Sequence, residues 1–259
     1  MKHLLLLFIV ALPFATLAET FELKGTYQGE NLYVKNPFAS AGVGFCVYEV
    51  TVNGMTTTDE INSSAFEVDL TVFGFRIGEP ITVKINYKEG CTPRVLNPDV
   101  LSPRATFEVE EMNIEGDNLV WTARNESGPL PYIVEQFRWN KWVTIGEVEG
   151  KGVPGAHRYS VPLRFHTGSN RFRIRQTDGQ KKNKYSAEIT HHSAKPPVAF
   201  TLGVGGDEIV FSQPTMYEVY DGYGRIVFKG VGERVKIGTL EKGRYYLNFD
   251  NKLDYFIKR

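Results

Sequence analysis

The sequence predicts an all-β protein made of three small β-sandwich modules in tandem. Short runs of alternating apolar and polar residues are interrupted by turn residues about every ten positions, which is typical of antiparallel sandwiches. Helical periodicity is almost absent. The aromatic residues are mostly Phe and Tyr, 17 and 13 of them, and both types favour strands.

The first segment predicts export. "MKHLLLLFIVALPFATLAET" joins a short basic start to an apolar run and then to small residues, the three-part pattern of a secretory signal peptide over residues 1–18. A membrane anchor is the alternative, although a spanning helix needs about 20 apolar residues and this run is shorter. We therefore expect the mature chain to start near Glu19, in a compartment that permits disulfides.

Residues 19–104 are expected to form an immunoglobulin-like β-sandwich. Asn53-Gly54 between two strand-like runs favours a type I′ hairpin, because both residues tolerate positive φ. The runs 66–70 and 81–85 each place alternate apolar residues on one face, and Gly78-Glu79-Pro80 marks the turn between them. A proline-rich segment then leads to a boundary near Ser102.

Two features of this first module are candidate sites. Cys46 and Cys91 are the only cysteines, and a bridge between them would close a loop of about 45 residues and stabilise the fold by roughly 4 kcal/mol. Two separate buried thiols are the alternative. Phe38 lies in the small-residue stretch "NPFASAGVGF", which is either a partner-binding loop or a flexible connection.

Residues 105–194 repeat the strand pattern. In "NRFRIRQTDG", Phe172 and Ile174 are expected to point inward, and the three arginines between and beside them outward. That basic ladder is either a solvated sheet face or a surface for an acidic partner. "RWNKW" predicts a tight turn with Trp142 placed like a core aromatic and Trp139 at the tip. An exposed Trp139 would bind a partner or a sugar; otherwise it covers its own sheet edge.

A stiff Lys195-Pro196-Pro197 linker opens a terminal module over residues 195–259. Its last two strands are predicted at "GRYYLNF" and "LDYFIKR", with Tyr245 and Leu247 on one face and Phe256 packed inward. Basic residues on the last strand discourage further strand addition.

Enzymatic chemistry is not expected. The chain has 30 basic and 30 acidic residues without a basic stripe, which argues against nucleic acid as a partner. It contains neither a G-x-S-x-G elbow nor an H-E-x-x-H motif, and no His lies at ligand spacing from a Cys. We expect no catalytic residues, no cofactor and no metal site.

The terminal residues "YEVYDGYGRIVFKG…VKIGTLEKGRYYLNFDNKLDYFIKR" resemble the C-terminal sorting domain of the Bacteroidota type IX secretion system, type A-like. The middle region, through "LVWTARNES", "YIVEQ" and "WVTIGEVEGKG", is similar to the fibronectin type III-like domains that often precede it. The resemblance covers about 150 residues. It implies that the sorting-motif residues are Asp221, Gly224, Arg225, Gly243, Tyr245, Ile257, Lys258 and Arg259.

The resemblance implies a non-enzymatic protein that is exported through the periplasm and acts by binding at the outer membrane or cell surface. Its partner would be a protein, either the type IX machinery or an outer-membrane complex. In that family the terminal domain is commonly removed at the surface. The usual Pro-Asn-Pro opening is absent from "VAFTLGVGGDEIVFS". One alternative is therefore a permanent accessory subunit of an outer-membrane assembly that retains this module. A carbohydrate-binding module is a further alternative, with a glycan as the partner.

Overall fold

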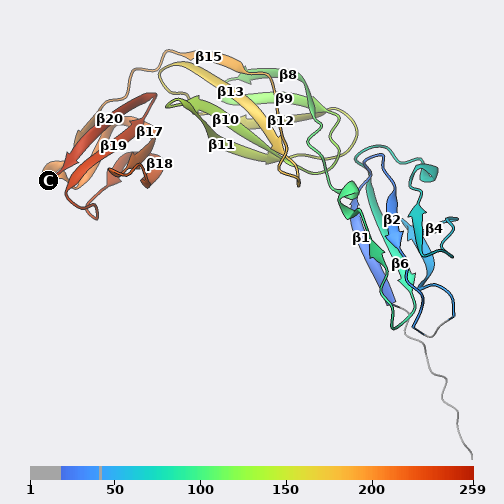
Figure 1. The fold of residues 1–259 in the computed structure, drawn as a ribbon. Helices are drawn as coiled ribbons and strands as arrows, with labels where there is room; N and C mark the ends of the chain where they lie inside the picture. The colour runs from blue at the N-terminus through green and yellow to red at the C-terminus, as the bar shows by residue number, and fades with distance from the viewer. Residues whose placement is uncertain (1–18, 41–42) are drawn as a thin grey trace, which may run out of the picture. The chain divides into compact units, whose positions relative to one another are not determined.

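The computed structural model describes residues 19–40 and 43–259. These residues form twenty strands and three short 3-10 helices, which confirms the all-β prediction (Figure 1). The expected signal peptide, residues 1–18, lies outside the described residues. The chain divides into two compact units with the boundary between Pro103 and Arg104. The second unit holds two separate hydrophobic clusters, one for the middle module and one for the terminal module.

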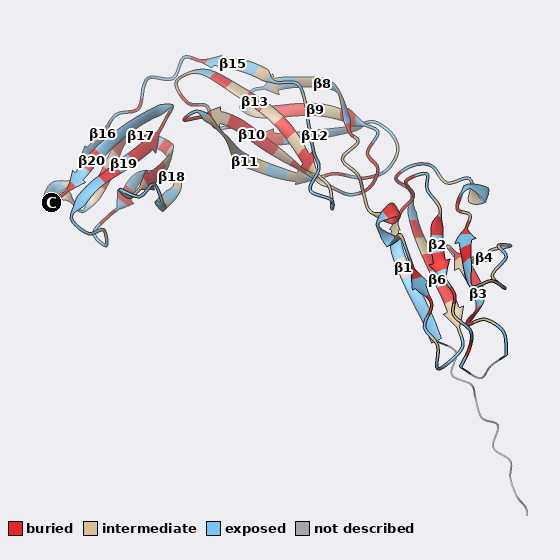
Figure 2. Cartoon of the chain, in the orientation of Figure 1, coloured by how far each residue is buried: buried red, intermediate tan, exposed pale blue. Residues whose placement is uncertain are grey.

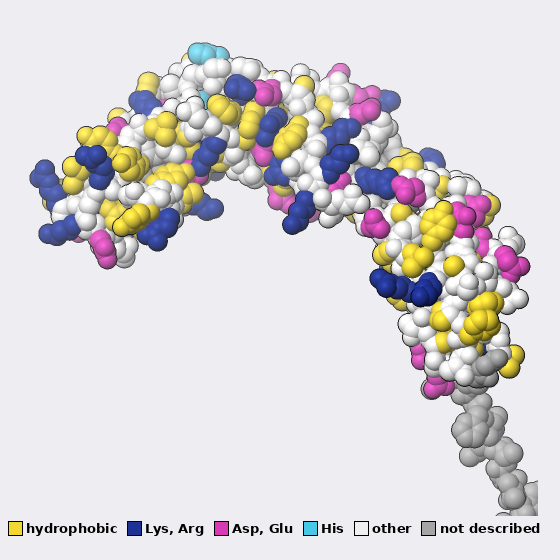
Figure 3. Space-filling model, in the orientation of Figure 1, with side chains coloured by type: hydrophobic (Ala, Val, Ile, Leu, Met, Phe, Trp, Pro, Cys, Tyr) yellow, Lys and Arg dark blue, Asp and Glu magenta, His cyan; other side chains and the backbone are white. Residues whose placement is uncertain are grey.

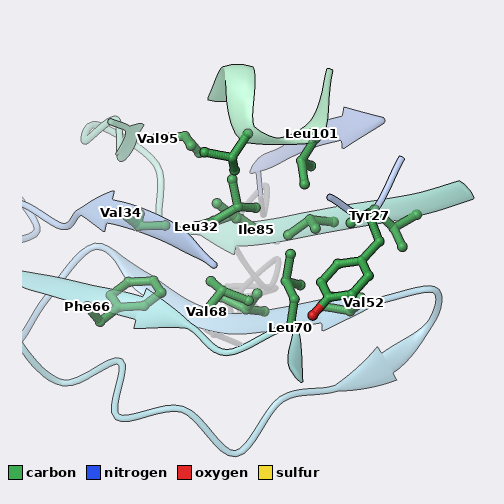
Figure 4. Close-up of a cluster of buried hydrophobic side chains, with 14 of the residues drawn as sticks. Tyr27, Leu32, Val34, Val52, Phe66, Val68, Leu70, Ile85, Val95 and Leu101 are labelled. Atoms are coloured by element: carbon green, nitrogen blue, oxygen red, sulfur yellow. The ribbon is translucent and has the colours of Figure 1, made fainter. Parts of the chain in front are cut away.

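The first unit is a sandwich of two antiparallel sheets. One sheet has the strand order β1 (Glu19–Thr26), β6 (Pro80–Tyr87), β3 (Val47–Val52) and β4 (Met55–Thr56). The other has the order β5 (Ala65–Val68), β2 (Leu32–Lys35) and β7 (Arg94–Val95). The core contains the residues that the alternating pattern assigned inward, namely Phe66, Val68, Leu70, Ile81, Val83 and Ile85 (Figure 4).

Local turn chemistry in this unit follows the sequence. Asn53 and Gly54 have φ values of 48° and 83° between paired Val52 and Met55, so the predicted type I′ hairpin is confirmed. The short 3-10 helix η1 (Thr71–Phe73) follows the core strand β5. The proline-rich segment forms a second 3-10 helix, η2 (Pro98–Leu101), whose Val100 and Leu101 complete the core.

The predicted disulfide is confirmed: Cys46 and Cys91 are bridged, with Cα atoms 6.0 Å apart. Cys46 directly precedes β3, and Cys91 follows β6, the strand with which β3 pairs. The bridge therefore continues a ladder that already brings the two segments together.

The middle module is a sandwich of a five-stranded sheet and a three-stranded sheet. In the five-stranded sheet, four strands are neighbours in a row and the fifth also pairs with one of them. The row runs β11 (Lys141–Glu149), β10 (Pro131–Arg138), β13 (Gly168–Thr177) and β14 (Asn183–Tyr185), and β15 (Ile189–Ser193) also pairs with β13. The opposite sheet has the order β12 (His157–Pro162), β9 (Asn118–Arg124) and β8 (Glu108–Glu115). Along β13, buried residues alternate with half-buried ones (Figure 2).

The core aromatic of the middle module is Trp121, whose ring lies 5.6 Å from that of Tyr132 and 5.4 Å from that of Tyr159. The expectation that Trp142 fills this place is wrong. Trp142 lies outside the core cluster, where the guanidinium groups of Arg173 and Arg171 approach its ring to 4.1 Å and 5.5 Å. The two arginines on the outward face thus hold an aromatic residue there.

The terminal module is built around the long, bent strand β17 (Glu208–Tyr220). The pairing order is β16 (Phe200–Leu202), β17, β19 (Gly243–Phe249) and β20 (Lys252–Lys258), and β18 (Ile226–Lys236) also pairs with β17. A register break between Val210 and Thr215 lets β17 pair with β16 in its first half and β19 in its second. The short 3-10 helix η3 (Val204–Gly206) precedes β17. Tyr245, Leu247 and Phe256 point into the core, as predicted.

Removing the disulfide should destabilise the first unit. A double substitution, Cys46→Ala with Cys91→Ala, is expected to lower its free energy of unfolding by about 2–5 kcal/mol, because the unfolded chain regains the entropy of an open loop. Denaturant unfolding followed by circular dichroism measures this change. An unaltered midpoint in the double variant would show that the bridge contributes nothing to stability.

Candidate functional site

The sorting-like residues Asp221, Gly224 and Arg225 form one self-contained turn between β17 and β18. The Asp221 carboxylate accepts hydrogen bonds from the backbone amides of Tyr223 and Arg225, both at 2.9 Å, and pairs with the Arg225 side chain at 2.7 Å. Gly224 adopts a φ of 79°, which favours glycine. The backbone hydrogen bond from Arg225 holds the pKa of Asp221 below its ordinary value, against its partial desolvation. The sequence pattern here encodes turn geometry.

The remaining sorting-like residues lie on the last two strands. Gly243 pairs with Lys258 and Tyr245 pairs with Phe256 in the β19–β20 ladder. Tyr220, the residue before the Asp221 turn, pairs with Tyr246. In an antiparallel sheet this register puts the β17–β18 turn, the start of β19 and the end of β20 at one end of the sheet. We call this the distal end of the terminal sheet.

Several of these residues have internal partners. Lys258 is buried, and its ammonium group donates to the Gly206 carbonyl at 3.1 Å and pairs with Asp207. Tyr245 stacks on Phe256, and its hydroxyl donates to the Glu241 carbonyl. Other members of the set face solvent: the Arg225 side chain is 75% exposed, and Ile257 and Arg259 are exposed as well.

An exposed apolar patch runs along the outward face of β19 and β20, from Leu253 near the β19–β20 turn to Ile257 near the distal end. It consists of four side chains that are 46–63% exposed: Tyr246, Leu253, Tyr255 and Ile257. Tyr246 and Tyr255 are direct cross-strand partners, and the Arg244 guanidinium lies 5.0 Å from the Tyr255 ring centre. Hydrophobic and basic side chains lie next to one another on this module (Figure 3). We call these five residues the β19–β20 patch.

Trp139 corrects a second expectation: it is 6% exposed and does not form an open contact at a loop tip. Trp139 and Asn140 have φ values of 50° and 60° in a two-residue turn between β10 and β11, so the tight turn itself is as predicted. The Lys141 ammonium group lies 5.9 Å from the Trp139 ring and 5.6 Å from the ring of Tyr220 in the terminal module. The hairpin tip is therefore covered within its own unit.

Contacts between the middle and terminal modules, which we call the junction, include a buried arginine. Arg138 is 2% exposed and donates to Gln136 Oε1 at 2.6 Å, to the Arg164 carbonyl at 2.7 Å and to the Asp250 carbonyl at 3.1 Å. Burial lowers the pKa of Arg138 to about 10, and the nearby Asp250 opposes that shift. The side chain remains charged at neutral pH.

Asp250 is the corresponding buried acid on the terminal module. It occupies the β19–β20 turn with a φ of 50°. Its Oδ1 accepts a hydrogen bond from the backbone amide of Thr167 at 2.9 Å, and its Oδ2 accepts one from Val198 at 3.3 Å. One carboxylate thus bonds to the middle module and to the first residues of its own module.

A third junction contact joins Lys141 to Glu218 at 2.7 Å and to the Tyr220 hydroxyl at 2.8 Å. Burial disfavours the charged form of Glu218, but hydrogen bonds from Lys141 and Tyr220 outweigh this effect, so the pKa of Glu218 is lowered. Burial also disfavours the charged form of Lys141, and its bonds to Glu218 and Tyr220 leave its pKa raised. Both shifts show that the pair is stabilised in its charged form.

A crevice of about 490 Å³ lies beside these contacts. Its walls come from both modules, and they include Arg138, Leu163 and Phe165 on one side and Thr215, Met216 and Asp250 on the other. The junction is thus a set of discrete contacts around a gap and not one continuous packed face.

The remaining candidate residues lie apart from the junction. Phe38 is 66% exposed and stacks on Phe45 with ring centres 4.4 Å apart, so its assignment as a partner contact stays a prediction. In the basic ladder of β13, Arg173 and Arg175 both pair with Glu135, and Arg171 pairs with Glu188. Every arginine of that ladder therefore has an acidic partner in its own module.

Within residues 19–40 and 43–259, no group of three or more His, Cys, Asp or Glu side chains is arranged to hold a metal ion. The same residues include no helix with the length and apolarity to span a bilayer.

Comparison of the sequence with protein-family models and with curated proteins gives no match. Similar solved structures include a β-glucuronidase from Ruminococcus gnavus, with 13% identity over 75% of this chain and 38% of that chain, at a TM-score of 0.20. This chain therefore spans less than half the length of that enzyme. A tetra-tandem repeat from the extending region of a large adhesion protein shows 11% identity over 92% of this chain and 68% of the other, at a TM-score of 0.29.

The FN1–FN3 domains of chicken CNTN1 show 11% identity over 93% of this chain and 97% of theirs, at a TM-score of 0.23. Scores this low carry no argument about activity, substrate or partner.

The Lys141–Glu218 pair predicts acid sensitivity of the second unit. Because the pKa of Glu218 is lower in the folded state, its contribution to stability is present above its unfolded pKa and is lost as the pH falls below about 4. The difference in thermal midpoint between the parent chain and Glu218→Gln should therefore shrink as the pH falls through this range. A difference that is the same at neutral and acidic pH would contradict the assignment.

Proposed function

We propose that this chain is a non-enzymatic, exported, modular β protein that acts by binding at the bacterial outer membrane or cell surface. In this proposal a protein partner binds the terminal module. The observation that carries the proposal is the distal end of the terminal sheet. There the exposed Arg225 and Arg259 of the sorting-like set lie near the β19–β20 patch, which itself contains the third solvent-facing member, Ile257.

The chemistry of the patch suits a protein partner. Exposed aromatic and aliphatic side chains supply apolar area, and arginines beside them are the residue type enriched at protein interfaces. A contiguous apolar surface of this kind is more often a contact site than an inert one on a soluble domain. The type IX resemblance of the same residues motivates the export route in this proposal.

A second candidate function is a permanent accessory subunit of an outer-membrane assembly that retains its terminal module. The junction favours it, because Arg138, Asp250 and Glu218 are all buried at the contact between the middle and terminal modules. A module intended for removal has no need of such contacts. The carbohydrate-binding alternative loses its main support, since Trp139 is buried.

In a bacterium with a type IX system, the full chain should reach the cell surface, and a strain lacking the system should retain it inside. Tyr255→Ser with Ile257→Ser should reduce surface display while leaving the fold intact, since both side chains already face solvent. Val72→Ser with Leu96→Ser, two exposed apolar residues of the first unit, is the matched control. Equal display in both strains would remove the proposed export route.

Mass spectrometry of the displayed protein separates the two candidate functions. Loss of the residues after about position 195 supports recognition followed by removal, whereas a chain that still ends at Arg259 supports the retained subunit.

A further inference from the structure

We infer that the terminal module is held to the middle module by the junction itself, so that cutting the linker between them does not release it. The tip of the β10–β11 hairpin in the middle module is therefore contacted by residues 198–259 of the same chain, which form the terminal module. This inference concerns the folded chain alone and does not depend on the proposed export route.

The first support is the placement of Trp139. A two-residue turn with positive φ at both positions normally takes Asn, Asp or Gly, and a bulky aromatic in this backbone conformation is strained. At a hairpin tip a Trp side chain would ordinarily face solvent, yet here only 6% of Trp139 does. The Arg138 guanidinium and Lys141 ammonium groups lie 6.0 Å and 5.9 Å from the Trp139 ring, and the same ammonium group lies 5.6 Å from the Tyr220 ring. The buried Trp side chain therefore lies beside a lysine that contacts the terminal module.

The second support is the set of buried polar contacts across the junction. Arg138 donates to the Asp250 carbonyl, the Thr167 amide donates to the Asp250 carboxylate, and Lys141 pairs with Glu218. Asp250 is 2% exposed and Glu218 is 8% exposed, so these two acids are shielded from solvent, whereas the Lys141 side chain is 40% exposed and its ion pair is partly screened. Two of these contacts share Asp250, and the Lys141–Glu218 pair is a separate one, so the modules meet at two places.

The third support is the contrast with the covalent link. Residues 194–197 are exposed, whereas Ser193 before them and Val198 after them are buried. Val198 belongs to the terminal core and donates its amide to Asp250. The linker carbonyls of Lys195 and Pro196 accept hydrogen bonds from the side chains of Thr167 and Gln213. A cut between Ala194 and Pro197 does not touch the residues of the Arg138–Asp250, Thr167–Asp250 and Lys141–Glu218 contacts.

The crevice beside the contacts limits the strength of the association between the middle and terminal modules. Because apolar packing is not continuous across the junction, the association should be reversible and depend on the charged contacts.

The test uses the full chain with a specific protease site replacing residues 194–197, cut after folding and passed over a size-exclusion column at micromolar concentration. We expect the two fragments to elute together. Lys141→Glu should weaken the association about ten-fold by placing two acids together, and Lys141→Glu with Glu218→Lys should restore it. Lys151→Glu, an exposed lysine of the same module, is the matched charge control.

Circular dichroism before cutting confirms that each variant is folded, and the charge-swapped pair reports on the contact even if one single variant fails to fold. Separate elution of the parent fragments would overturn the inference. So would co-elution of the Lys141→Glu fragments that equals that of the parent at every dilution, because the Lys141–Glu218 contact would then contribute nothing to the association.

Discussion

The position of the terminal sheet depends on one carboxylate. Asp250 sits in the tight turn between the last two strands, accepts one hydrogen bond from Thr167 of the middle module and another from Val198 of its own module, and offers its carbonyl to Arg138. A buried acid of this kind is tolerated only when its hydrogen bonds are satisfied. Here the donors that satisfy it come from both modules, so the folded turn and the docked arrangement support each other.

Docking at this turn divides the outward face of the terminal sheet. Asn248 and Glu218, on adjacent strands, are buried near the junction, whereas Tyr246 on the same outward face is 46% exposed. The uncovered part carries the β19–β20 patch and the distal end with its sorting-like residues. A partner that binds this part can do so without displacing the middle module. The junction and the β19–β20 patch thus occupy different parts of one small sheet.

Local sequence patterns predicted much of the fold. Alternating apolar residues in the first unit, the Asn53-Gly54 hairpin and the inward face of Phe172 and Ile174 depend on neighbours within one strand or turn. The junction could not be predicted in this way, since Arg138 and Asp250 are 112 positions apart. Trp142 was misassigned for the same reason, and of the two alternatives for Trp139, exposed or covered, the exposed one is wrong. Arg173, on another strand, lies over the ring of Trp142 on the outer face of the sheet. Trp139 is buried beside Lys141, which also contacts Tyr220 of the terminal module. The sequence did contain one indication that Trp139 is buried: it is a Trp at a turn position that normally favours Asn or Gly.

The central claim is that the terminal module is docked through Asp250, and amide hydrogen exchange resolved by residue tests it most directly. Thr167 lies outside the strands and its amide bonds to Asp250 of the other module, so this amide would exchange rapidly in a flexibly tethered pair of modules. The amide of Val198, which bonds to the same carboxylate within the terminal module, is the internal control. The account predicts that the Thr167 amide is protected to the same degree as those of the β19–β20 ladder. Rapid exchange at Thr167, with Val198 and the ladder protected, would contradict it.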